Sequence, residues 1–303
     1  MKNSPTTPDG PGHPEVGRRP GFWARIRQLP RAWVGAALVI LAVSAALFAP
    51  VVAPADPTYQ FRDGLSATGL PIAPGMGRFL LGTDNLGRDM LSRILYGAQV
   101  SLFVSLIANT LAAGIGTTVG VTAGYFPGSV LDSLLMRFTD VLMAFPAILL
   151  ALGLAAVLRP SAVVVTVIIA VITWPALARI VRSQVLLVRE LAFVESARSI
   201  GAGDLYIITR HILPHILMLV VIWATLSLPS TVLLETALSY LGVGVPPPTP
   251  SWGNMIADGQ TYYRNAPWLI LLPGAAILVT TLGFNLLGDA LRDALDPRTI
   301  YRS

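Results

Sequence analysis

Long apolar runs alternate with short polar segments along most of this 303-residue chain. A helix needs about 20 apolar residues to cross a hydrocarbon core about 30 Å thick. Six runs reach that length, at residues 33–53, 100–124, 139–158, 161–181, 212–235 and 267–288. Their centres are nearly free of charged residues, each of which would cost at least about 2.5–3.5 kcal/mol there. The pattern therefore predicts an all-α membrane protein with six transmembrane helices.

Glycine and proline add detail to these runs. Gly116, Gly120 and Gly124 recur every four residues, and this spacing predicts one helix face that a neighbouring helix approaches closely. Prolines within or beside the runs predict kinks, which serve either as hinges or to shape a cavity. They are Pro146, Pro175, Pro229 and Pro273.

Composition supports a membrane protein and excludes several kinds of site. Charged residues make up 12% of the chain, against about 25% in a typical soluble domain. The absence of cysteine excludes disulfides and thiolate-ligated metals. His211 and His215 are four residues apart, but we interpret them as an interfacial pair and expect no metal or catalytic site. The only lysine is Lys2, so the chain has no P-loop, and another subunit would have to bind any ATP that drives it.

The arginine distribution predicts the orientation. If the spans alternate, fifteen of the 21 basic residues fall on the side that holds both termini and the segment between the fourth and fifth runs. The positive-inside rule places that side in the cytoplasm. Residues 54–99 and 236–266 then face outside.

Four regions follow from this arrangement. Residues 1–30 are rich in proline and glycine and have little apolar mass, which predicts a disordered cytoplasmic tail. Residues 31–99 hold the first transmembrane helix and an external segment. Residues 100–291 form a core with five transmembrane helices, and residues 292–303 form a cytoplasmic C-terminal tail.

The polar segment before the fifth run has its own helical pattern. Residues 190–200 predict a short helix with Val194 and Ala197 on one face, and Gly201 stands where a left-handed residue would end it. Asp204 predicts the N-cap of a second short helix, and Pro214 falls in the first turn of the next span. Such a bent connector either docks into a groove on a soluble partner or lies on the lipid surface.

The same segment resembles a known motif. Glu195, Ala197 and Gly201, followed by Leu213 and Pro214, resemble the EAA loop of ABC importer permeases, with Ser196 and His211 as departures from its usual pattern. Residues 81–93, 247–253 and 285–297 resemble the dipeptide, oligopeptide and nickel branch of that family. Together the similar segments extend over residues 30–298, and the chain is similar to the "C" permease of a dipeptide or oligopeptide importer.

The resemblance implies a type I ABC importer permease fold with a cytoplasmic coupling helix, in the inner (plasma) membrane of a bacterium. It implies a second homologous permease subunit, two ABC ATPase subunits that bind ATP and Mg, and an external substrate-binding protein. This chain itself would bind no cofactor. The residues expected to couple it to the ATPase are Glu195, Ala197, Arg198, Gly201, Asp204, Leu205, Leu213 and Pro214. In this hypothesis Glu195 and Arg198 contact the ATPase and Ala197 gives a small docking surface, while Leu205 and Leu213 pack the loop against the bundle.

A second charged cluster precedes the second run. It consists of Asp84, Arg88, Asp89 and Arg93. We expect these residues either to contact the binding protein or the partner permease, or to lie on a solvated outer helix that begins at Asp84. Trp252 is a further candidate for such contacts, or else an anchor at the membrane interface.

Other functions remain open at this stage. The same architecture serves for nickel, glutathione or another small solute. A secondary transporter would typically show repeats, unwound spans or carboxylates at the midplane, and none is evident. An intramembrane enzyme would need catalytic groups within the spans, and a receptor or structural protein would leave the Glu195–Pro214 pattern unexplained.

Overall fold

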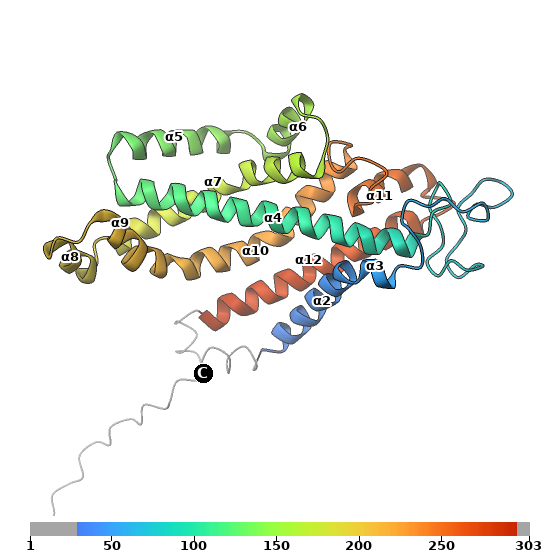
Figure 1. The fold of residues 1–303 in the computed structure, drawn as a ribbon, viewed down its shortest axis with the longest axis horizontal. Coiled ribbons are helices and arrows are strands. Elements are labelled where there is room, and N and C mark those ends of the chain that lie inside the picture. The colour runs from blue at the N-terminus through green and yellow to red at the C-terminus, as the bar shows by residue number, and fades with distance from the viewer. Residues whose placement is uncertain (1–28, 296–303) are drawn as a thin grey trace, which may run out of the picture.

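The computed structural model describes residues 29–295, with side chains to residue 294, and the long helices lie side by side (Figure 1). The helices of this part of the chain are α2 (Pro30–Leu47), α3 (Ala49–Val52), α4 (Met90–Tyr125), α5 (Val130–Ala144), α6 (Ala147–Val157), α7 (Ala162–Val188), α8 (Ala192–Ser199), α9 (Asp204–Ile207), the π-helix η1 (Ile208–Ile212), α10 (Leu213–Tyr240), α11 (Trp252–Gly259), the 3-10 helix η2 (Gln260–Tyr262) and α12 (Trp268–Leu295). Only isolated β-bridges occur beside them among residues 29–295. The prediction of an all-α protein is confirmed. Most of the two predicted tails, 1–30 and 292–303, lies outside the described residues.

Five helices are long and apolar enough to cross a membrane: α2, α4, α7, the continuous helix from Asp204 to Tyr240, and α12. The third predicted span, 139–158, is wrong as a single helix, because α5 and α6 are bent by 94° relative to each other. The break lies at Phe145 and Pro146. Proline lacks an N–H group and disfavours helical geometry in the residue before it, and Phe145 is accordingly extended, with φ −92° and ψ 138°. The two helices form one broken span or a re-entrant segment.

The spans are also longer than the hydropathy pattern predicts. Helix α4 begins at Met90 rather than at residue 100, because Asp89 caps it by accepting a hydrogen bond from the backbone N–H of Ser92 at 2.7 Å. Helix α7 continues to Val188 and α10 to Tyr240. Helix ends that extend beyond the hydrocarbon carry polar residues, so hydropathy alone does not find them.

The most extensive helix contact among the described residues is between α4 and α7, along the glycine face predicted for α4. A Cβ atom on Gly120 would lie 2.6 Å from the carbonyl oxygen of Ala178 and 2.6 Å from Cβ of Val181. Gly116 and Gly124 meet α7 just as closely. Small residues therefore bring the two backbones together, as the four-residue spacing indicated.

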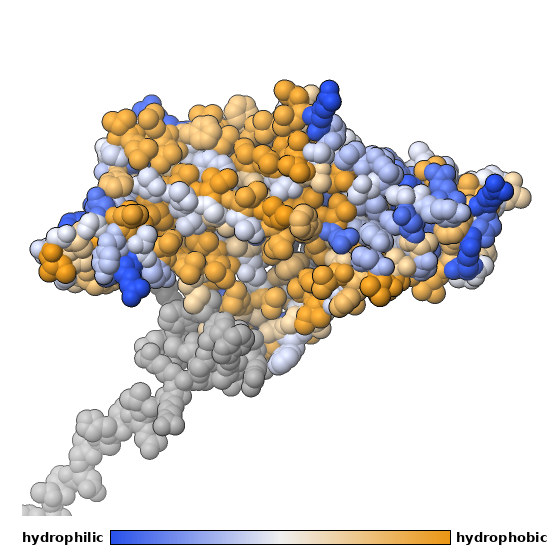
Figure 2. Space-filling view, in the orientation of Figure 1, coloured by the Kyte–Doolittle hydropathy of each residue, from blue (hydrophilic) through white to orange (hydrophobic). Residues whose placement is uncertain are grey.

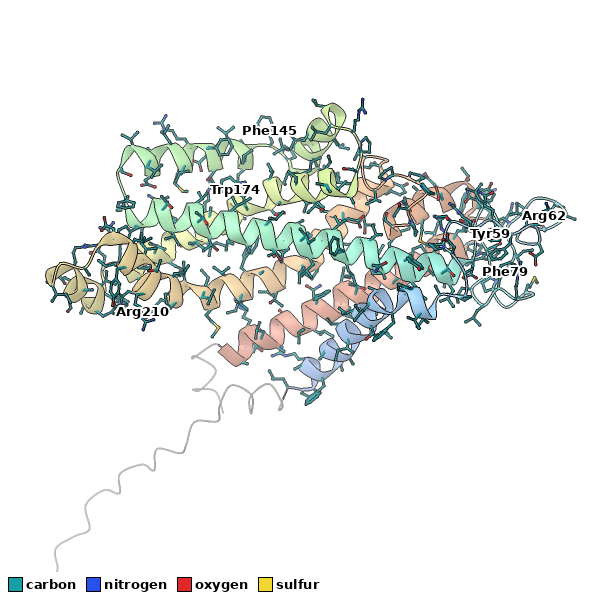
Figure 3. The ribbon with its side chains drawn as sticks, in the orientation of Figure 1. Tyr59, Arg62, Phe79, Phe145, Trp174 and Arg210 are labelled. Atoms are coloured by element: carbon teal, nitrogen blue, oxygen red, sulfur yellow. The ribbon has the colours of Figure 1, made fainter. Side chains whose placement is uncertain are left out.

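The surface separates into an apolar middle and two polar ends. Figure 2 shows apolar side chains over the middle of the visible face and hydrophilic residues over the irregular segment 53–89. Helices α8 and α9 project at the opposite end, and α2 begins and α12 ends toward that same side (Figure 1). Figure 3 places Arg210 near α8 and α9, and Tyr59, Arg62 and Phe79 at the far end. This arrangement is that of a helical bundle with an apolar belt.

One carboxylate is buried within a helix that is long and apolar enough to cross a membrane, although the predicted run ended on it. Because α10 extends to Tyr240, Glu235 falls within the helix, where it is fully buried. The Ser239 hydroxyl donates to its Oε1 at 2.8 Å, whereas Oε2 has no hydrogen-bond partner among the described residues. Glu235 is five residues from the end of α10, or about 8 Å along the axis, so it lies near one end of the helix rather than at its centre.

Candidate functional site

The turn between α8 and α9 has the geometry predicted for it. Gly201 has φ +82°, in the left-handed region. Its N–H donates to the Arg198 carbonyl at 3.0 Å, and the Ala202 N–H donates to the Ala197 carbonyl at 3.1 Å. These two bonds form a Schellman motif, which supplies hydrogen-bond donors to carbonyl groups at the end of α8. The chain is therefore fixed in a sharp turn at Gly201.

The inner face of this segment packs on the bundle. Val194, Ala197, Ile207 and Ile212 are buried in one cluster with the end of α7, and Leu213 packs against it as predicted. The predicted role of Ala197 as a docking surface is wrong, because its side chain is only 7% exposed and lies against this chain's own core.

Leu205 was expected to pack inward and does not. It is 76% exposed, whereas Ile207 in the same helical turn is fully buried. Two residues along a helix correspond to about 200° of rotation, so only one of the pair can face the bundle. Ile207 occupies the inward position, and Leu205 belongs to the outer surface.

A polar contact ties α9 to α4. Asp204 was predicted to be the N-cap of α9, but the N-cap is Gly203 and Asp204 is the first residue of the helix. Its carboxylate instead accepts a hydrogen bond from the Tyr125 hydroxyl at 2.8 Å. The Arg198 guanidinium lies 6.0 Å from the centroid of the same ring, and Arg189 donates to the Tyr125 carbonyl at 3.0 Å. Tyr125, the last residue of α4, is thus the point to which the segment is fastened.

Aromatic stacking fastens α8 to the start of the next helix. The ring of Phe193 stacks on His215 at 4.8 Å between centroids and lies 6.0 Å from His211. Pro214 stands in the first turn of α10, as predicted. Continuous helical structure runs from α9 through η1 into α10, so a displacement of α8 and α9 would act directly on a membrane helix.

The outer face of α8 and α9 is exposed and mixed in character. Glu195 and Arg198 are exposed, and no ion pair joins them within residues 29–294. Ile200 is 86% exposed, and Tyr206 lies alongside Leu205 among the exposed apolar side chains. Charged groups beside uncovered apolar side chains are typical of a surface that binds another protein. We define these five residues as the outer face of the loop.

The second predicted cluster is buried, which contradicts both interpretations given to it. Asp84, Arg88, Asp89 and Arg93 are each at most 5% exposed. Asp84 accepts from Arg88 Nε at 2.5 Å and lies 3.1 Å from Nη1 of Arg93, while Nη2 of Arg93 lies 3.4 Å from Asp258 of α11. Burial raises the pKa of the Asp258 carboxyl, and the charges of Arg93 and Arg88 oppose that shift. The cluster joins the outer segment, α4 and α11 within this chain.

Trp252 is also internal. It is 1% exposed, its indole N–H donates to the Ile94 carbonyl at 3.2 Å, and its backbone N–H donates to the Ser101 hydroxyl at 3.2 Å. The prediction of an external or interfacial contact for Trp252 is therefore wrong. A tryptophan can satisfy its single N–H in a core, and here it anchors α11 on α4.

Sequence reasoning missed Tyr125 and Asp258, the partners that hold these two sites together. Tyr125 is 79 residues from Asp204, and Asp258 is 165 residues from Arg93. No local spacing indicates either contact.

Comparisons with known proteins agree with this architecture. Residues 116–301 match the family "Binding-protein-dependent transport system inner membrane component", and residues 21–68 match the "N-terminal TM domain of oligopeptide transport permease C". The chain is 40% identical over 277 residues to the di/tripeptide transport system permease protein DppC of Pseudomonas aeruginosa, covering 91% of each protein. It is 43% identical to the glutathione transport system permease protein GsiD of Escherichia coli O6:H1, covering 91% of this chain and 89% of GsiD.

A solved structure shows the same fold. A chain of the inward-facing MetNI methionine ABC transporter superposes with a TM-score of 0.57 at 20% identity, covering 68% of this chain and 98% of that one. At this identity the match supports the fold alone. With the family match and the relatives above, it shows that this chain belongs to the binding-protein-dependent transport system inner membrane components, as a multi-pass permease subunit of an ABC importer and not its ATPase.

Proposed function

We propose that this chain forms half of the translocation pathway of an ATP-driven importer of di- or oligopeptides, and that α8 and α9 couple it to the ATPase. The peptide cargo is supported by the similarity to the di/tripeptide permease and by the match of residues 21–68 to an oligopeptide permease domain. The other half of the pathway is a second homologous permease. Two ATPase subunits bind ATP and Mg, and an external binding protein delivers the peptide.

The observation that carries the coupling role is the contrast between the two faces of the loop. Its inner face is buried against α4, α7 and α10, whereas Glu195, Arg198, Ile200, Leu205 and Tyr206 are exposed at the end of the bundle. Because its inner face is packed on the membrane helices, the loop moves with them, so a partner that displaces its exposed face also displaces those helices. The excess of basic residues at this end supports its placement in the cytoplasm, where ATP is available.

The energy to be transmitted is modest. Changing a two-state bundle from about 1:99 to 99:1 requires about 5.5 kcal/mol of differential binding. The ATPase dimer supplies that bias if its closed form binds the outer face of the loop better in one bundle conformation than in the other. Glu195 and Arg198 then act as polar contacts, and the exposed Ile200 and Leu205 as apolar ones.

Glutathione is the second candidate cargo, because the glutathione permease is at least as similar to this chain as the di/tripeptide permease is. Dipeptides and glutathione share a free carboxylate and an ammonium group. The permease therefore meets similar chemistry in both cases, and the binding protein decides between them.

Reconstitution tests the function. The permease pair, its ATPases and the binding protein are assembled in proteoliposomes, and ATP-dependent uptake of a labelled dipeptide is compared with that of labelled glutathione. We expect dipeptide uptake that requires both ATP and the binding protein. Uptake of glutathione alone would select the second candidate, and uptake of neither would contradict the proposal.

A further inference from the structure

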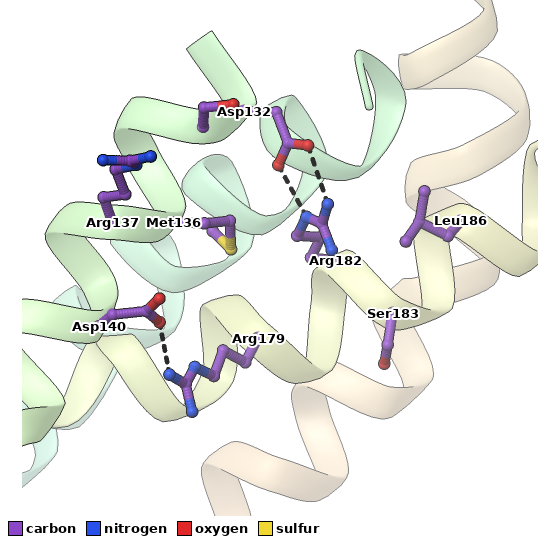
Figure 4. A pocket seen from close by; sticks show the side chains of 9 residues that line it. Asp132, Met136, Arg137, Asp140, Arg179, Arg182, Ser183 and Leu186 are labelled. Atoms are coloured by element: carbon purple, nitrogen blue, oxygen red, sulfur yellow. Dashed lines mark hydrogen bonds and ion pairs between the residues drawn. The ribbon is translucent and has the colours of Figure 1, made fainter. Parts of the chain in front are cut away.

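A charged cavity of about 600 Å³ lies between α5 and α7, on the half of the bundle nearest α8 and α9 (Figures 1 and 4). Five of its nine lining residues are charged. They are Asp132, Arg137 and Asp140 of α5, and Arg179 and Arg182 of α7. Neither the predicted coupling residues nor the buried outer cluster contributes to it. We call it the α5–α7 cavity.

The charges form one stripe on each helix. Ser133, Arg137 and Asp140 follow one face of α5, while the exposed side chains of Leu134 and Val141 follow another. On α7 the polar stripe contains Arg179, Arg182 and Ser183 at spacings of three and four, which place residues on one side of a helix. The two polar stripes face each other across the cavity, and α5 presents its apolar side elsewhere (Figure 4).

The two ion pairs in the cavity differ in character. Arg182 holds Asp132 with two parallel hydrogen bonds of 2.8 Å, and Asp132 is only 5% exposed. Arg179 holds Asp140 through one nitrogen at 2.5 Å, and both side chains are about half exposed, at 49% and 57%. Exposed pairs add little stability and rearrange readily. The pair of Arg182 and Asp132 is a fixed part of the cavity lining, whereas Arg179 and Asp140 can separate and pair with other groups.

Arg137 leaves the cavity with an excess of positive charge. It is exposed and forms no ion pair with the described residues. With three arginines against two aspartates, the lining carries a net charge of +1. An exposed guanidinium without an ion pair binds a carboxylate ligand well, through a planar pair of N–H donors.

The position of the cavity near one end of the span indicates that it holds water. Arg179 is 17 residues from the first residue of α7, or about 26 Å along a helix that crosses a core about 30 Å thick. Charged residues this close to the end of a span face the water of the membrane interface or a water-filled cavity, because hydrocarbon would not solvate them. The stripe on α5 and α7 therefore lines an aqueous space at the end of the bundle that carries α8 and α9.

We propose that the α5–α7 cavity is a transient site for the free carboxylate of the cargo on its way through the permease, an inference that rests on the proposed import of peptides. Arg137 and Arg179 bind the carboxylate, and Asp140, once separated from Arg179, accepts the ammonium group of the same zwitterion. Arg182 and Asp132 keep the two helices in register. Loose pairing suits this site, since cargo that bound tightly would not leave.

The absence of cysteine from the chain gives a direct test. The variant Ser183→Cys places a single thiol in the cavity, and Val141→Cys places one on the exposed apolar side of α5 as the control. The assembled, nucleotide-free complex is treated with a membrane-impermeant methanethiosulfonate, and the mass shift of this chain is followed. We expect severalfold faster modification for Ser183→Cys, because the reactive thiolate forms in water.

Protection by cargo tests the carboxylate itself. A dipeptide with a free C-terminus should slow the modification of Ser183→Cys, and the same dipeptide amidated at its C-terminus should not. Adding Arg137→Gln and Arg179→Gln should abolish the protection, while Arg159→Gln, in the exposed connection between α6 and α7, should leave it unchanged. Equal protection by the amide, protection that survives the double substitution, or modification as slow as in Val141→Cys would each overturn the proposal.

The two proposals fail separately. If the complex imports no peptide with ATP and the binding protein, the proposed function is wrong whatever the labelling shows. If it imports peptide normally but the carboxylate gives no protection, only the α5–α7 cavity site is wrong.

Discussion

Gly201 allows the segment of α8 and α9 to be perturbed by backbone strain alone. Its φ of +82° is a left-handed conformation that costs an L-residue about 1–2 kcal/mol. Apart from its chain neighbours, no described heavy atom lies within 4 Å of a Cβ built at this position. Gly201→Ala therefore adds strain without a clash, and the strain acts on the Schellman turn that ends α8.

The loop contains a matched control. Gly203 also has no described atom within 4 Å of a built Cβ, but its φ is −69°, which any residue adopts. A strain of about 1–2 kcal/mol lowers the population of the native turn, relative to its alternatives, by a factor of about 5–30. We expect Gly201→Ala to reduce ATP-dependent uptake by up to that factor and Gly203→Ala to leave it nearly unchanged. Gly201→Asn should fall between them, because asparagine tolerates the left-handed region.

The assay is uptake in proteoliposomes, normalised to the amount of assembled complex and compared with its rate of ATP hydrolysis. A larger loss for Gly201→Trp than for Gly201→Ala is expected if a partner covers this turn, since no described heavy atom lies within 4 Å of a Cβ built there. Uptake that is normal in Gly201→Ala but impaired in Gly203→Ala would refute the reasoning.

Three further predictions concern the framework of the permease. Gly120→Ala forces apart α4 and α7, because its Cβ would lie 2.6 Å from two atoms, and it should lower the free energy of unfolding by about 1–3 kcal/mol. Gly114→Ala is the control, because no described atom lies within 4 Å of a Cβ built there, and it should leave the free energy of unfolding unchanged. Thermal denaturation in detergent compares the two variants. Arg93→Gln removes one of the two buried guanidinium groups that face Asp84 and Asp258, and Arg88 alone then faces both carboxylates. This should cost about 3–5 kcal/mol, seen as loss of protease-resistant protein; a normal yield would contradict the buried network. Tyr125→Phe removes the hydrogen bond to Asp204 and should lower peptide uptake per ATP hydrolysed with little change in folded yield; an unchanged ratio would show that this contact is not needed for coupling.

Local patterns predicted the features that local forces determine. Five spans, the glycine face of α4 and the turn at Gly201 each depend on residues within a few positions of one another, and the structure has all of them. The break at Pro146 could have been predicted from the sequence, because proline and the residue before it both disfavour a helix. Hydropathy outweighed it in the prediction, since residues 141–157, on both sides of the break, contain no charged residue.

Contacts between distant segments could not be predicted in the same way. The sequence predicts that the charged cluster at Asp84 contacts a partner or is solvated, because the contact with Asp258 cannot be seen in it. It predicts that Asp204 caps a helix, because the contact with Tyr125 cannot be seen either. The α5–α7 cavity likewise needs both helices, because Arg179 and Asp140 are 39 residues apart. Each helix shows a polar stripe, but only their packing shows that the stripes face each other.

The coupling role of α8 and α9 is tested most directly by crosslinking from their exposed turn. The variant Ile200→Cys gives a unique thiol at a side chain that is 86% exposed, and Tyr59→Cys, 58% exposed at the opposite end, is the control. Each complex is treated with a short thiol-directed photocrosslinker, and the partner is identified by mass spectrometry. Crosslinking of the ATPase subunit by Ile200→Cys and not by Tyr59→Cys is the predicted result. An assembled complex in which Ile200→Cys forms no ATPase adduct would contradict the account.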